Sequence, residues 1–415
     1  MSLQGPLVVI SQKPATSLVS ALGAAGAFPI IEVRWADAPS ALGSIKPAAV
    51  ILPEADSPNP KALVALAQQI ARAEPIVPII ARVRDDALPV LSDALPVATE
   101  APVERLVTQL GAALRLRALH ATVLGRARRL KSERNIIAEV PPGDPLEDAT
   151  VLVVGRGRSH PTLCVAVGER VGVMGALSVD LAARCLSARE VDGIVVGDGL
   201  SGRSVEAFLQ VLTEDSRFRD LPVAVLGPGD DKAALPNFLR ARDPRILVQR
   251  LLPLVRMHAF EARLKRLLTS IECKGMIDVR TGLLNVDAFG RDLTRAIEDA
   301  GERGVGLSVA RFSFETKVDV RASMDAARLV SRLIRDIDFA CRQDDGSMLV
   351  VFTETDLRAA HVVARRLASV LKHTMLRPGD ERPHLNPTVT LATLKPSDSL
   401  LTLMARIAPR TVAAE

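Results

Sequence analysis

Residues 278–289 read Asp-Val-Arg-Thr-Gly-Leu-Leu-Asn-Val-Asp-Ala-Phe, a short polar turn that leads directly into a helical pattern. This stretch opens a segment, from about residue 273 to the end, in which helices and strands follow one another irregularly. Its two middle strands, Asp338–Arg342 and Met348–Thr353, flank an Asp-Gly pair that is typical of a hairpin turn. The segment therefore predicts an α+β unit around a mixed or antiparallel sheet. Its helices are predicted at Val286–Asp299, Ala322–Arg335 and Asp356–Leu371, and its outer strands at Val305–Phe314 and Pro387–Leu394.

Upstream of this segment, two stretches alternate short β-branched runs with helical patterns. Such alternation predicts parallel sheets covered by helices on both faces, so we expect two α/β units of five strands each. Val140–Asp148 is rich in proline and predicts a linker between the two units. Strands are predicted at Pro6–Ile10, Ile30–Trp35, Ala48–Leu52, Ile76–Ala81 and Leu95–Thr99, and then at Val151–Gly155, Gly172–Met174, Gly193–Gly197, Pro222–Gly227 and Arg245–Val248.

Each α/β unit ends in a predicted helix that is unusually long. The first, Val103–Arg134, exceeds the length needed to cover a sheet, and we expect it to pair with another helix. The second, about Leu251–Lys274, carries an apolar seam at 4-3-4 spacing, which predicts a short two-stranded coiled coil and hence a homodimer. A helix packed on its own sheet is an equally good interpretation of the first half. The seam consists of Phe260, Leu264, Leu267 and Ile271.

Composition excludes several classes of protein. Hydrophobic residues make up 48% and charged residues 24%, so the chain is neither disordered nor fibrous. Aromatic residues make up 3% and tyrosine is absent, which removes most stacking platforms for single-stranded nucleic acid. No apolar run approaches the ~18 residues of a membrane helix. The four cysteines are too scattered for a zinc or disulfide framework. We expect a cytoplasmic protein with reduced thiols and with no nucleic-acid or membrane partner.

The stretch from Asp278 to Asn285, with Ala288 and Phe289 after it, resembles the opening signature D-x-x-T-G-L-x-N-x-x-A-F of the GGDEF (diguanylate cyclase) domain family. The residues from Arg342 to Met348 align with the R-x-G-G-D-E-F signature of that family. Together with the two preceding α/β units, the chain resembles receiver–receiver–GGDEF regulators of the PleD and PopA type. The resemblance implies two flavodoxin-like, receiver-like (βα)5 domains and a nucleotidyl-cyclase-like, mixed-sheet GGDEF domain. Their implied bounds are 1–138 and 149–272, joined by a linker at 139–148, and 273–415.

The residues with which this family condenses two GTP molecules are missing. The family needs glycines against the nucleotide and carboxylates that hold two Mg²⁺ ions. Here Asp344 and Asp345 replace the glycines, and Gly346 and Ser347 replace the acidic pair before Met348. The other metal-binding strand end reads Arg311-Phe312-Ser313 in place of D-x-D. We therefore expect no enzymatic activity, no catalytic residue, no bound metal and no cofactor.

One ligand-binding element of the family is retained. GGDEF proteins commonly carry an R-x-x-D motif, five residues before the signature, that binds the product cyclic di-GMP as an inhibitory site. Arg335 and Asp338 stand at this spacing from Asp344, and Arg366 aligns with a third family ligand on the following helix. An arginine fork can grip guanine O6 and N7 while a carboxylate accepts the N1 and N2 protons. Chance copies such as Arg34–Asp37 and Arg82–Asp85 exist, so the position of the motif carries the inference.

Both receiver-like units lack the residues of a phospho-receiver, which needs an acidic pair for Mg²⁺, a phosphoacceptor Asp, a Ser or Thr, and a Lys together. Only Asp198 lies near a phosphoacceptor position, and we expect it to be inert. We therefore predict an inactive GGDEF-family protein that senses cyclic di-GMP and relays this to an unidentified protein partner. The alternatives are a dimeric scaffold without a ligand and, more remotely, a residual cyclase.

Overall fold

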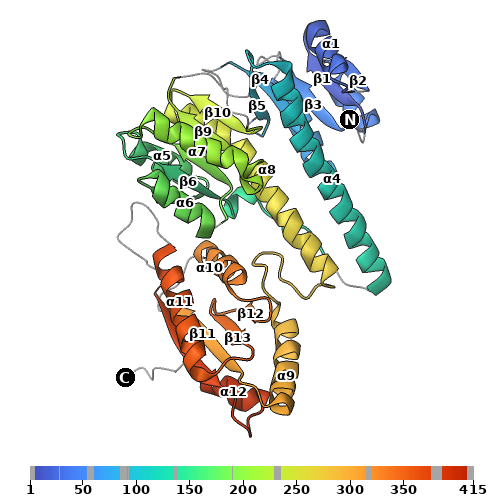
Figure 1. The fold of residues 1–415 in the computed structure, drawn as a ribbon. Coiled ribbons are helices and arrows are strands. Elements are labelled where there is room, and N and C mark those ends of the chain that lie inside the picture. Colours follow the sequence, from blue (N-terminus) through green and yellow to red (C-terminus); the bar gives the residue numbers. More distant parts are fainter. Residues whose placement is uncertain are drawn as a thin grey trace. The chain divides into compact units, whose positions relative to one another are not determined.

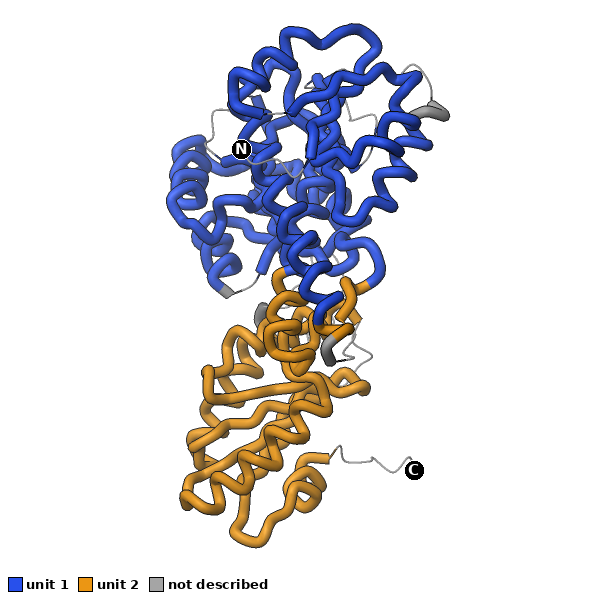
Figure 2. The backbone as a smooth tube through the Cα atoms, turned by 90° about the vertical axis from the view of Figure 1, so that its right-hand side faces the viewer, with its two compact units in different colours: residues 1–129, 142–264 blue, residues 130–141, 265–415 orange. Residues whose placement is uncertain are grey.

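The computed structural model of the chain describes residues 5–27, 29–53, 60–84, 91, 93–134, 138–188, 190–228, 235–314, 320–374 and 386–408. The chain forms two compact units, which Figure 2 shows in different colours. The first unit comprises residues 1–129 and 142–264, and it holds both predicted α/β sheets. The second comprises residues 130–141 and 265–415 and holds the predicted α+β sheet.

The first unit contains two five-stranded sheets, and every strand pair in both is parallel. The strand orders are β2-β1-β3-β4-β5 and β10-β9-β8-β6-β7, which is the same 2-1-3-4-5 order in each half. The flavodoxin-like fold predicted from the sequence is therefore confirmed. The strands are β1 (Leu7–Ser11), β2 (Ile30–Arg34), β3 (Ala49–Leu52), β4 (Ile79–Val83), β5 (Leu95–Ala98), β6 (Thr150–Val154), β7 (Gly172–Ala176), β8 (Gly193–Val196), β9 (Val223–Leu226) and β10 (Phe238–Ala241).

Helices connect these strands and cover the sheets (Figure 1). Two of them, α2 and α5, were not predicted from the sequence. Among the described residues between β4 and β5, and between β9 and β10, there is no helix. The helices are α1 (Thr16–Ala24), α2 (Ala38–Ser44), α3 (Pro60–Ala71), α4 (Val103–Arg134), α5 (His160–Gly168), α6 (Val179–Ala188), α7 (Gly202–Glu214) and α8 (Pro244–Glu272), with short 3-10 turns at Pro145–Glu147 and Ser216–Phe218.

The strand predicted at Arg245–Val248 is wrong, because these residues belong to the first turn of α8. The Asp243 carboxylate accepts hydrogen bonds from the backbone N–H groups of Arg245, at 2.8 Å, and Ile246, at 3.0 Å. Pro244 occupies the first helical position, where its missing N–H costs nothing. This Asp-Pro start outweighs the β-branched character of the residues that follow, and the fifth strand is instead β10.

The predicted pairing of the long helix α4 is confirmed, and its partner is α8 (Figure 1). Both helices contribute to one hydrophobic core with the two sheets, and the His120 and Phe260 rings meet edge to face at 5.2 Å. The seam residues Leu264 and Leu267 are at most 1% exposed within one chain. These two seam residues are therefore covered within one chain, whereas Phe260 is only half-buried, and the homodimer stays a prediction.

Arg263 of α8 binds the linker between the two α/β halves, and its side chain is 4% exposed. Its Nε and Nη2 atoms donate to one Asp148 carboxylate oxygen at 3.0 and 2.7 Å, and its remaining bonds go to the backbone oxygens of Gly143 and Asp144. A buried guanidinium with this many partners is compensated for its loss of water. The predicted linker is thus held in place.

The second unit is built on a sheet of strand order β12-β13-β11-β14. These strand pairs are antiparallel, and one isolated parallel bridge joins Leu284 to Cys341, so the sheet is mixed, as predicted. Side chains alternate along β11: Ala310 and Phe312 pack with α10 and α11, whereas Val309 packs with α9 and α12. The elements are α9 (Val286–Arg303), β11 (Ser308–Phe314), α10 (Val320–Leu333), β12 (Phe339–Arg342), β13 (Met348–Phe352), α11 (Leu357–Thr374), β14 (Pro387–Thr393) and α12 (Leu400–Arg406).

Candidate ligand site and degenerate signature

Arg335 lies in the turn between α10 and β12, and its side chain is exposed. The turn is closed by a hydrogen bond from the Asp338 backbone N–H to the Arg335 carbonyl oxygen at 2.9 Å. Within the part of the chain that the structure describes, the Arg335 guanidinium has no hydrogen bond and no ion pair. A guanidinium carries five N–H donors, and none of those of Arg335 has a partner among the described residues. Arg335 is therefore free to bind an acceptor from outside the chain.

The Asp338 side chain is directed inward and is 7% exposed. Its Oδ1 atom accepts a hydrogen bond from the backbone N–H of Thr353 at 3.0 Å, which ties the start of β12 to the end of β13. Burial raises the pKa of the Asp338 carboxyl above its usual value, although the Thr353 bond and the charge of Arg335 act in the opposite direction. Asp338 thus has a structural role that the sequence did not indicate, and truncating it would not leave the turn intact.

Arg366, the third predicted ligand residue, lies on α11 and is exposed. The helix packs beside α10, because Leu329 and Val330 of α10 share a core with Ala364 and Leu367 of α11. The turn with Arg335 follows directly from α10. Both cations therefore lie on the solvent side of one pair of packed helices.

The hairpin between β12 and β13 contains the predicted degenerate signature. Arg342 pairs with Met348 across the two strands, which leaves a loop of five residues from Gln343 to Ser347. The loop closes through a hydrogen bond from the Gln343 N–H to the Ser347 carbonyl oxygen at 2.8 Å. Gly346 has a φ angle of +82°, a conformation that favours glycine. The Asp-Gly turn signal was therefore correct, and Asp344 at the loop tip is exposed.

Arg311 and Asp345 form an ion pair at the place where the family resemblance would put metal-binding carboxylates. The Asp345 Oδ1 atom also accepts hydrogen bonds from the Ser347 backbone N–H, at 2.9 Å, and from the Ser347 hydroxyl, at 2.6 Å. Burial acts to raise the pKa of the Asp345 carboxyl, but the Ser347 bonds and the Arg311 charge outweigh it and hold this pKa below its usual value. Both oxygens of this carboxylate thus have partners within the chain.

These residues do not fit a pair of Mg²⁺ ions. Hard divalent cations need several carboxylate or carbonyl oxygens, whereas this position offers a cation, Arg311, and a carboxylate that is already bound to it. Among the described residues there is no group of three or more His, Cys, Asp or Glu side chains that could hold a metal ion. The Arg311–Asp345 pair spans 34 positions of sequence, so no local pattern could have revealed it.

Asp198 follows β8 at the carboxyl end of the second sheet, where its side chain caps the start of α5. Its Oδ1 atom accepts bonds from the Ser159 hydroxyl and, at 3.1 Å, from the Ser159 backbone N–H. The bond from the Ser159 hydroxyl is the main cause that lowers the pKa of Asp198. A Cβ atom on Gly157 would lie 2.2 Å from the Asp198 carboxyl carbon, so the Asp198 side chain could keep this position only beside a glycine. The Asp198 carboxylate therefore joins the loop after β8 to the loop before α5.

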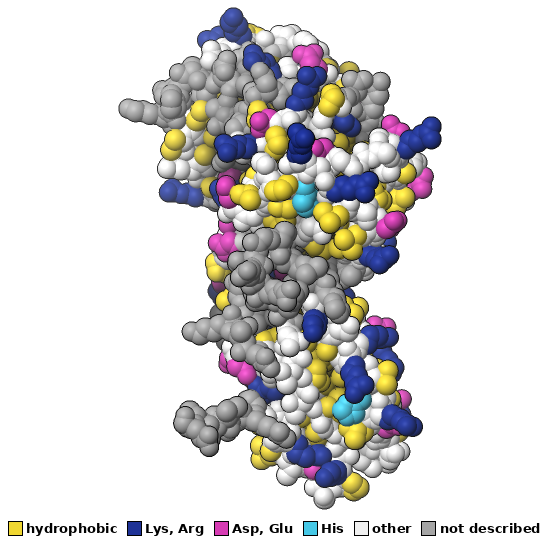
Figure 3. Space-filling view, turned by 90° about the vertical axis from the view of Figure 1, so that its left-hand side faces the viewer, with side chains coloured by type: hydrophobic (Ala, Val, Ile, Leu, Met, Phe, Trp, Pro, Cys, Tyr) yellow, Lys and Arg dark blue, Asp and Glu magenta, His cyan; other side chains and the backbone are white. Residues whose placement is uncertain are grey.

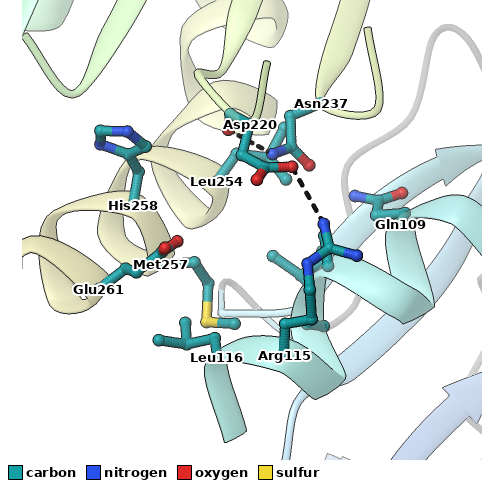
Figure 4. Close-up of a pocket in the computed structure, with 12 residues that line it drawn as sticks. Gln109, Arg115, Leu116, Asp220, Asn237, Leu254, Met257, His258 and Glu261 are labelled. Atoms are coloured by element: carbon teal, nitrogen blue, oxygen red, sulfur yellow. Dashed lines mark hydrogen bonds and ion pairs between the residues drawn. The ribbon is translucent and has the colours of Figure 1, made fainter. Parts of the chain in front are cut away.

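A pocket lies between α4 and α8 in the first unit (Figure 4). Arg115 of α4 forms an ion pair with Asp220 at 3.1 Å, and the Asn237 amide donates to the Asp220 carbonyl oxygen at 2.7 Å. The pocket is also lined by apolar residues from β5, α4 and α8, including Leu95, Leu116, Leu254 and Met257. Because Arg115 and Asp220 form an ion pair with each other, we interpret this pocket as part of the contact between the two α/β halves.

No family model and no curated protein matches the sequence. Solved GGDEF structures are similar to part of it. The coiled coil and GGDEF domain of DgcB from Caulobacter crescentus, in complex with c-di-GMP, is 20% identical, with a TM-score of 0.30, over 35% of this chain and 83% of that one. The FimX GGDEF domain from Pseudomonas aeruginosa is 17% identical, with a TM-score of 0.28, over 32% of this chain and 88% of that one.

A third similar structure is diguanylate cyclase SiaD in complex with its activator SiaC, from Pseudomonas aeruginosa. It is 17% identical, with a TM-score of 0.29, over 35% of this chain and 59% of that one. All three likenesses cover about a third of the chain, and we base the functional assignment on the chain's own residues. In the described part of the chain, no helix has the length and hydrophobicity needed to cross a membrane.

Proposed function

We propose that this chain is a catalytically inactive GGDEF-family signalling protein that binds cyclic di-GMP with Arg335 and Arg366 and relays that state through protein contacts. The observation that carries the proposal is the Arg335 side chain. It is exposed, it has no hydrogen bond or ion pair among the described residues, and it stands at the motif position relative to the signature hairpin. An exposed arginine at this position is available to an anionic ligand.

The chemistry of cyclic di-GMP suits this surface. Its guanine bases present O6 and N7 to an arginine fork, and its two phosphates suit the guanidinium groups of Arg335 and Arg366. One Asp338 oxygen is engaged by Thr353, but an ionised carboxylate offers about four lone-pair sites. Asp338 can therefore keep its structural bond and still accept a guanine N–H at the rim of the site.

The proposed loss of catalysis rests on Arg311. A two-metal mechanism needs carboxylates that clamp both reacting oxygens, and here the guanidinium of Arg311 occupies that position and neutralises Asp345. Metal binding would first have to break this ion pair. A second candidate function, a scaffold without a ligand, is favoured by one observation: the Asp338 carboxylate is 7% exposed and already serves the fold.

The test is a calorimetric titration of the full chain with cyclic di-GMP and, as a matched control, cyclic di-AMP. Adenine lacks both O6 and the N1 proton, so the account expects saturable binding of the guanine ligand alone. A parallel incubation with GTP and Mg²⁺ or Mn²⁺ should yield no cyclic di-GMP above a control without protein. Absence of binding at micromolar ligand would favour the scaffold, and product formation would refute the proposed inactivity.

A further inference from the structure

The solvent face of α11 carries a straight row of five exposed side chains, which we call the α11 stripe. It consists of Arg358, Val362, Arg365, Ser369 and Lys372, and these positions follow one another at 4-3-4-3 spacing. The opposite face of the helix is anchored in the domain, because Ala360, Ala364, Leu367 and Leu371 are at most 2% exposed. The orientation of the stripe toward solvent is therefore fixed by the packing of the helix.

The stripe is positively charged, and its helix supplies no acidic side chain to balance that charge. The sequence of α11, Leu357–Thr374, contains no Asp or Glu. In the described ranges of the chain, none of the three stripe cations, Arg358, Arg365 and Lys372, forms a hydrogen bond or an ion pair. Val362, between the first two, is 66% exposed. Figure 3 shows the side of the molecule on which α11 lies, with Lys and Arg side chains and hydrophobic side chains interspersed over the C-terminal unit.

The spacing indicates what kind of partner would fit. A 4-3-4-3 row is the line along which two α-helices pack on each other. Here three of the five positions on that line are cations, so a helix with acidic residues at the matching positions would be selected by opposite charge. A phosphate backbone or a lipid surface needs positive charge but no heptad spacing. Exposed Val362 within the row also offers an apolar contact, which phosphates would leave unused.

We propose that the α11 stripe is a docking site for an acidic helix of a partner protein, with Glu or Asp at heptad spacing opposite Arg358, Arg365 and Lys372. This inference deepens the proposed function, because it names the chemistry of the partner to which the ligand state is relayed. Arg366 is displaced from Arg365 by about 100° around the helix. The stripe and the cyclic di-GMP residues are therefore separate, and each can be tested alone.

The experiment uses the full chain and a fluorescent synthetic helical peptide of three heptads with Glu along one line. The control peptide has the same composition, with its Glu residues moved off that line. The double variant Arg358→Gln/Arg365→Gln removes two stripe cations. The matched double variant Arg291→Gln/Arg295→Gln removes two exposed cations from α9, which lies on the other face of the sheet.

We expect fluorescence anisotropy to show binding of the heptad peptide, weakened about tenfold by the stripe variant and unchanged by the α9 variant. Cyclic di-GMP affinity, measured on the same proteins, should change by less than about twofold, because neither substituted residue is one of the proposed ligand residues and Arg365 projects about 100° away from Arg366 around the helix. Equal binding of both peptides would overturn the proposal, as would tighter binding of a DNA duplex or of phosphatidylserine vesicles through the same residues. Absence of peptide binding, or self-association of the chain through the stripe, would also overturn it. None of these outcomes depends on whether cyclic di-GMP binds.

Discussion

Arg311, in the middle of β11, and Arg335, in the turn before β12, have opposite environments. The Arg311 side chain is 11% exposed and pairs with Asp345, next to the signature hairpin. Arg335 is exposed and lies in the turn that joins α10 to β12, without an ion pair in the described part of the chain. The Arg311 side chain is thus tied into the fold by an ion pair, whereas the Arg335 guanidinium has no hydrogen bond or ion pair among the described residues.

This contrast separates arginines that the fold uses from arginines that remain available to a ligand. A buried cation persists when a nearby carboxylate compensates for its loss of water. An exposed cation costs the fold little, so its presence needs no internal partner. Paired arginines should therefore affect stability when they are removed, and free arginines should affect binding alone.

The largest stability effect should follow from Arg263→Ala. Arg263 is more buried than the paired Arg311, and its removal takes away its hydrogen bonds to the Asp148 carboxylate and to two backbone carbonyl oxygens. Breaking one partner of a buried pair costs about 3–5 kcal/mol. Urea denaturation monitored by circular dichroism measures the loss. Arg115→Ala, which breaks the exposed pair with Asp220, should cost at most about 1 kcal/mol. Equal costs for the two variants would contradict the account.

Asp338→Ala should destabilise the second unit by about 1–3 kcal/mol, because the Thr353 N–H loses its acceptor in a partly buried position. Asp338→Asn keeps an oxygen at this position and should retain most of the stability. Thermal unfolding of both variants separates the two roles of this residue. If the alanine variant has the same melting temperature as the wild type, the bond from Asp338 to Thr353 does not stabilise the fold, and Asp338 is available to a ligand as Arg335 is.

Asp345→Ala should cost about 1 kcal/mol, less than a fully buried pair, since the Asp345 side chain is 52% exposed and solvent screens it. The loss comes from the Ser347 bonds and from leaving Arg311 without its partner. Asp336→Ala, at an exposed position in the Arg335 turn, is the control and should leave stability unchanged. Chemical denaturation of the two variants compares a carboxylate that is paired with Arg311 with one in the Arg335 turn.

The smallest effect should be a dependence of stability on pH through His120 of α4. Burial lowers the pKa of His120, with Glu74 raising it and Arg117 lowering it further. The ring accepts the Ile76 N–H at Nδ1, at 3.2 Å, and so is held neutral. The unfolded chain therefore takes up protons first, and stability should fall as the pH drops below about 6.5. The melting temperature of His120→Gln, measured at several pH values, should depend less on pH in this range than that of the wild type.

Much of the fold could be predicted from the sequence, since buried parallel strands appear as continuous apolar runs. The runs at β1, β3, β6 and β8 are buried over their whole length, and for this reason they were found. The start of α8 was missed because its first turn is rich in β-branched residues. The apolar seam of that helix was found, but periodicity cannot distinguish a cover within the chain from a second copy.

The candidate site was predictable in position but not in geometry. The spacing of Arg335 from the signature could be read directly, because both belong to one continuous stretch. The inward direction of Asp338 depends on Thr353, which the antiparallel register of β12 and β13 brings to it from 15 residues away. The Arg311–Asp345 pair depends on the same sheet. Contacts made across strands follow from tertiary structure, and no local pattern contains them.

The most direct test of the account is the affinity of cyclic di-GMP for the wild type, Arg335→Ala and Arg34→Ala, measured by calorimetry. Arg34 is a matched control, because it is exposed and belongs to a chance copy of the motif in which the Asp37 N–H bonds the Arg34 carbonyl at 3.0 Å, as in the Arg335 turn. The account predicts that Arg335→Ala loses about 1–3 kcal/mol of binding, roughly five- to 150-fold, with unchanged thermal stability. Arg34→Ala should bind like the wild type. Equal affinity of all three proteins, or no binding by the wild type, would contradict the central claim.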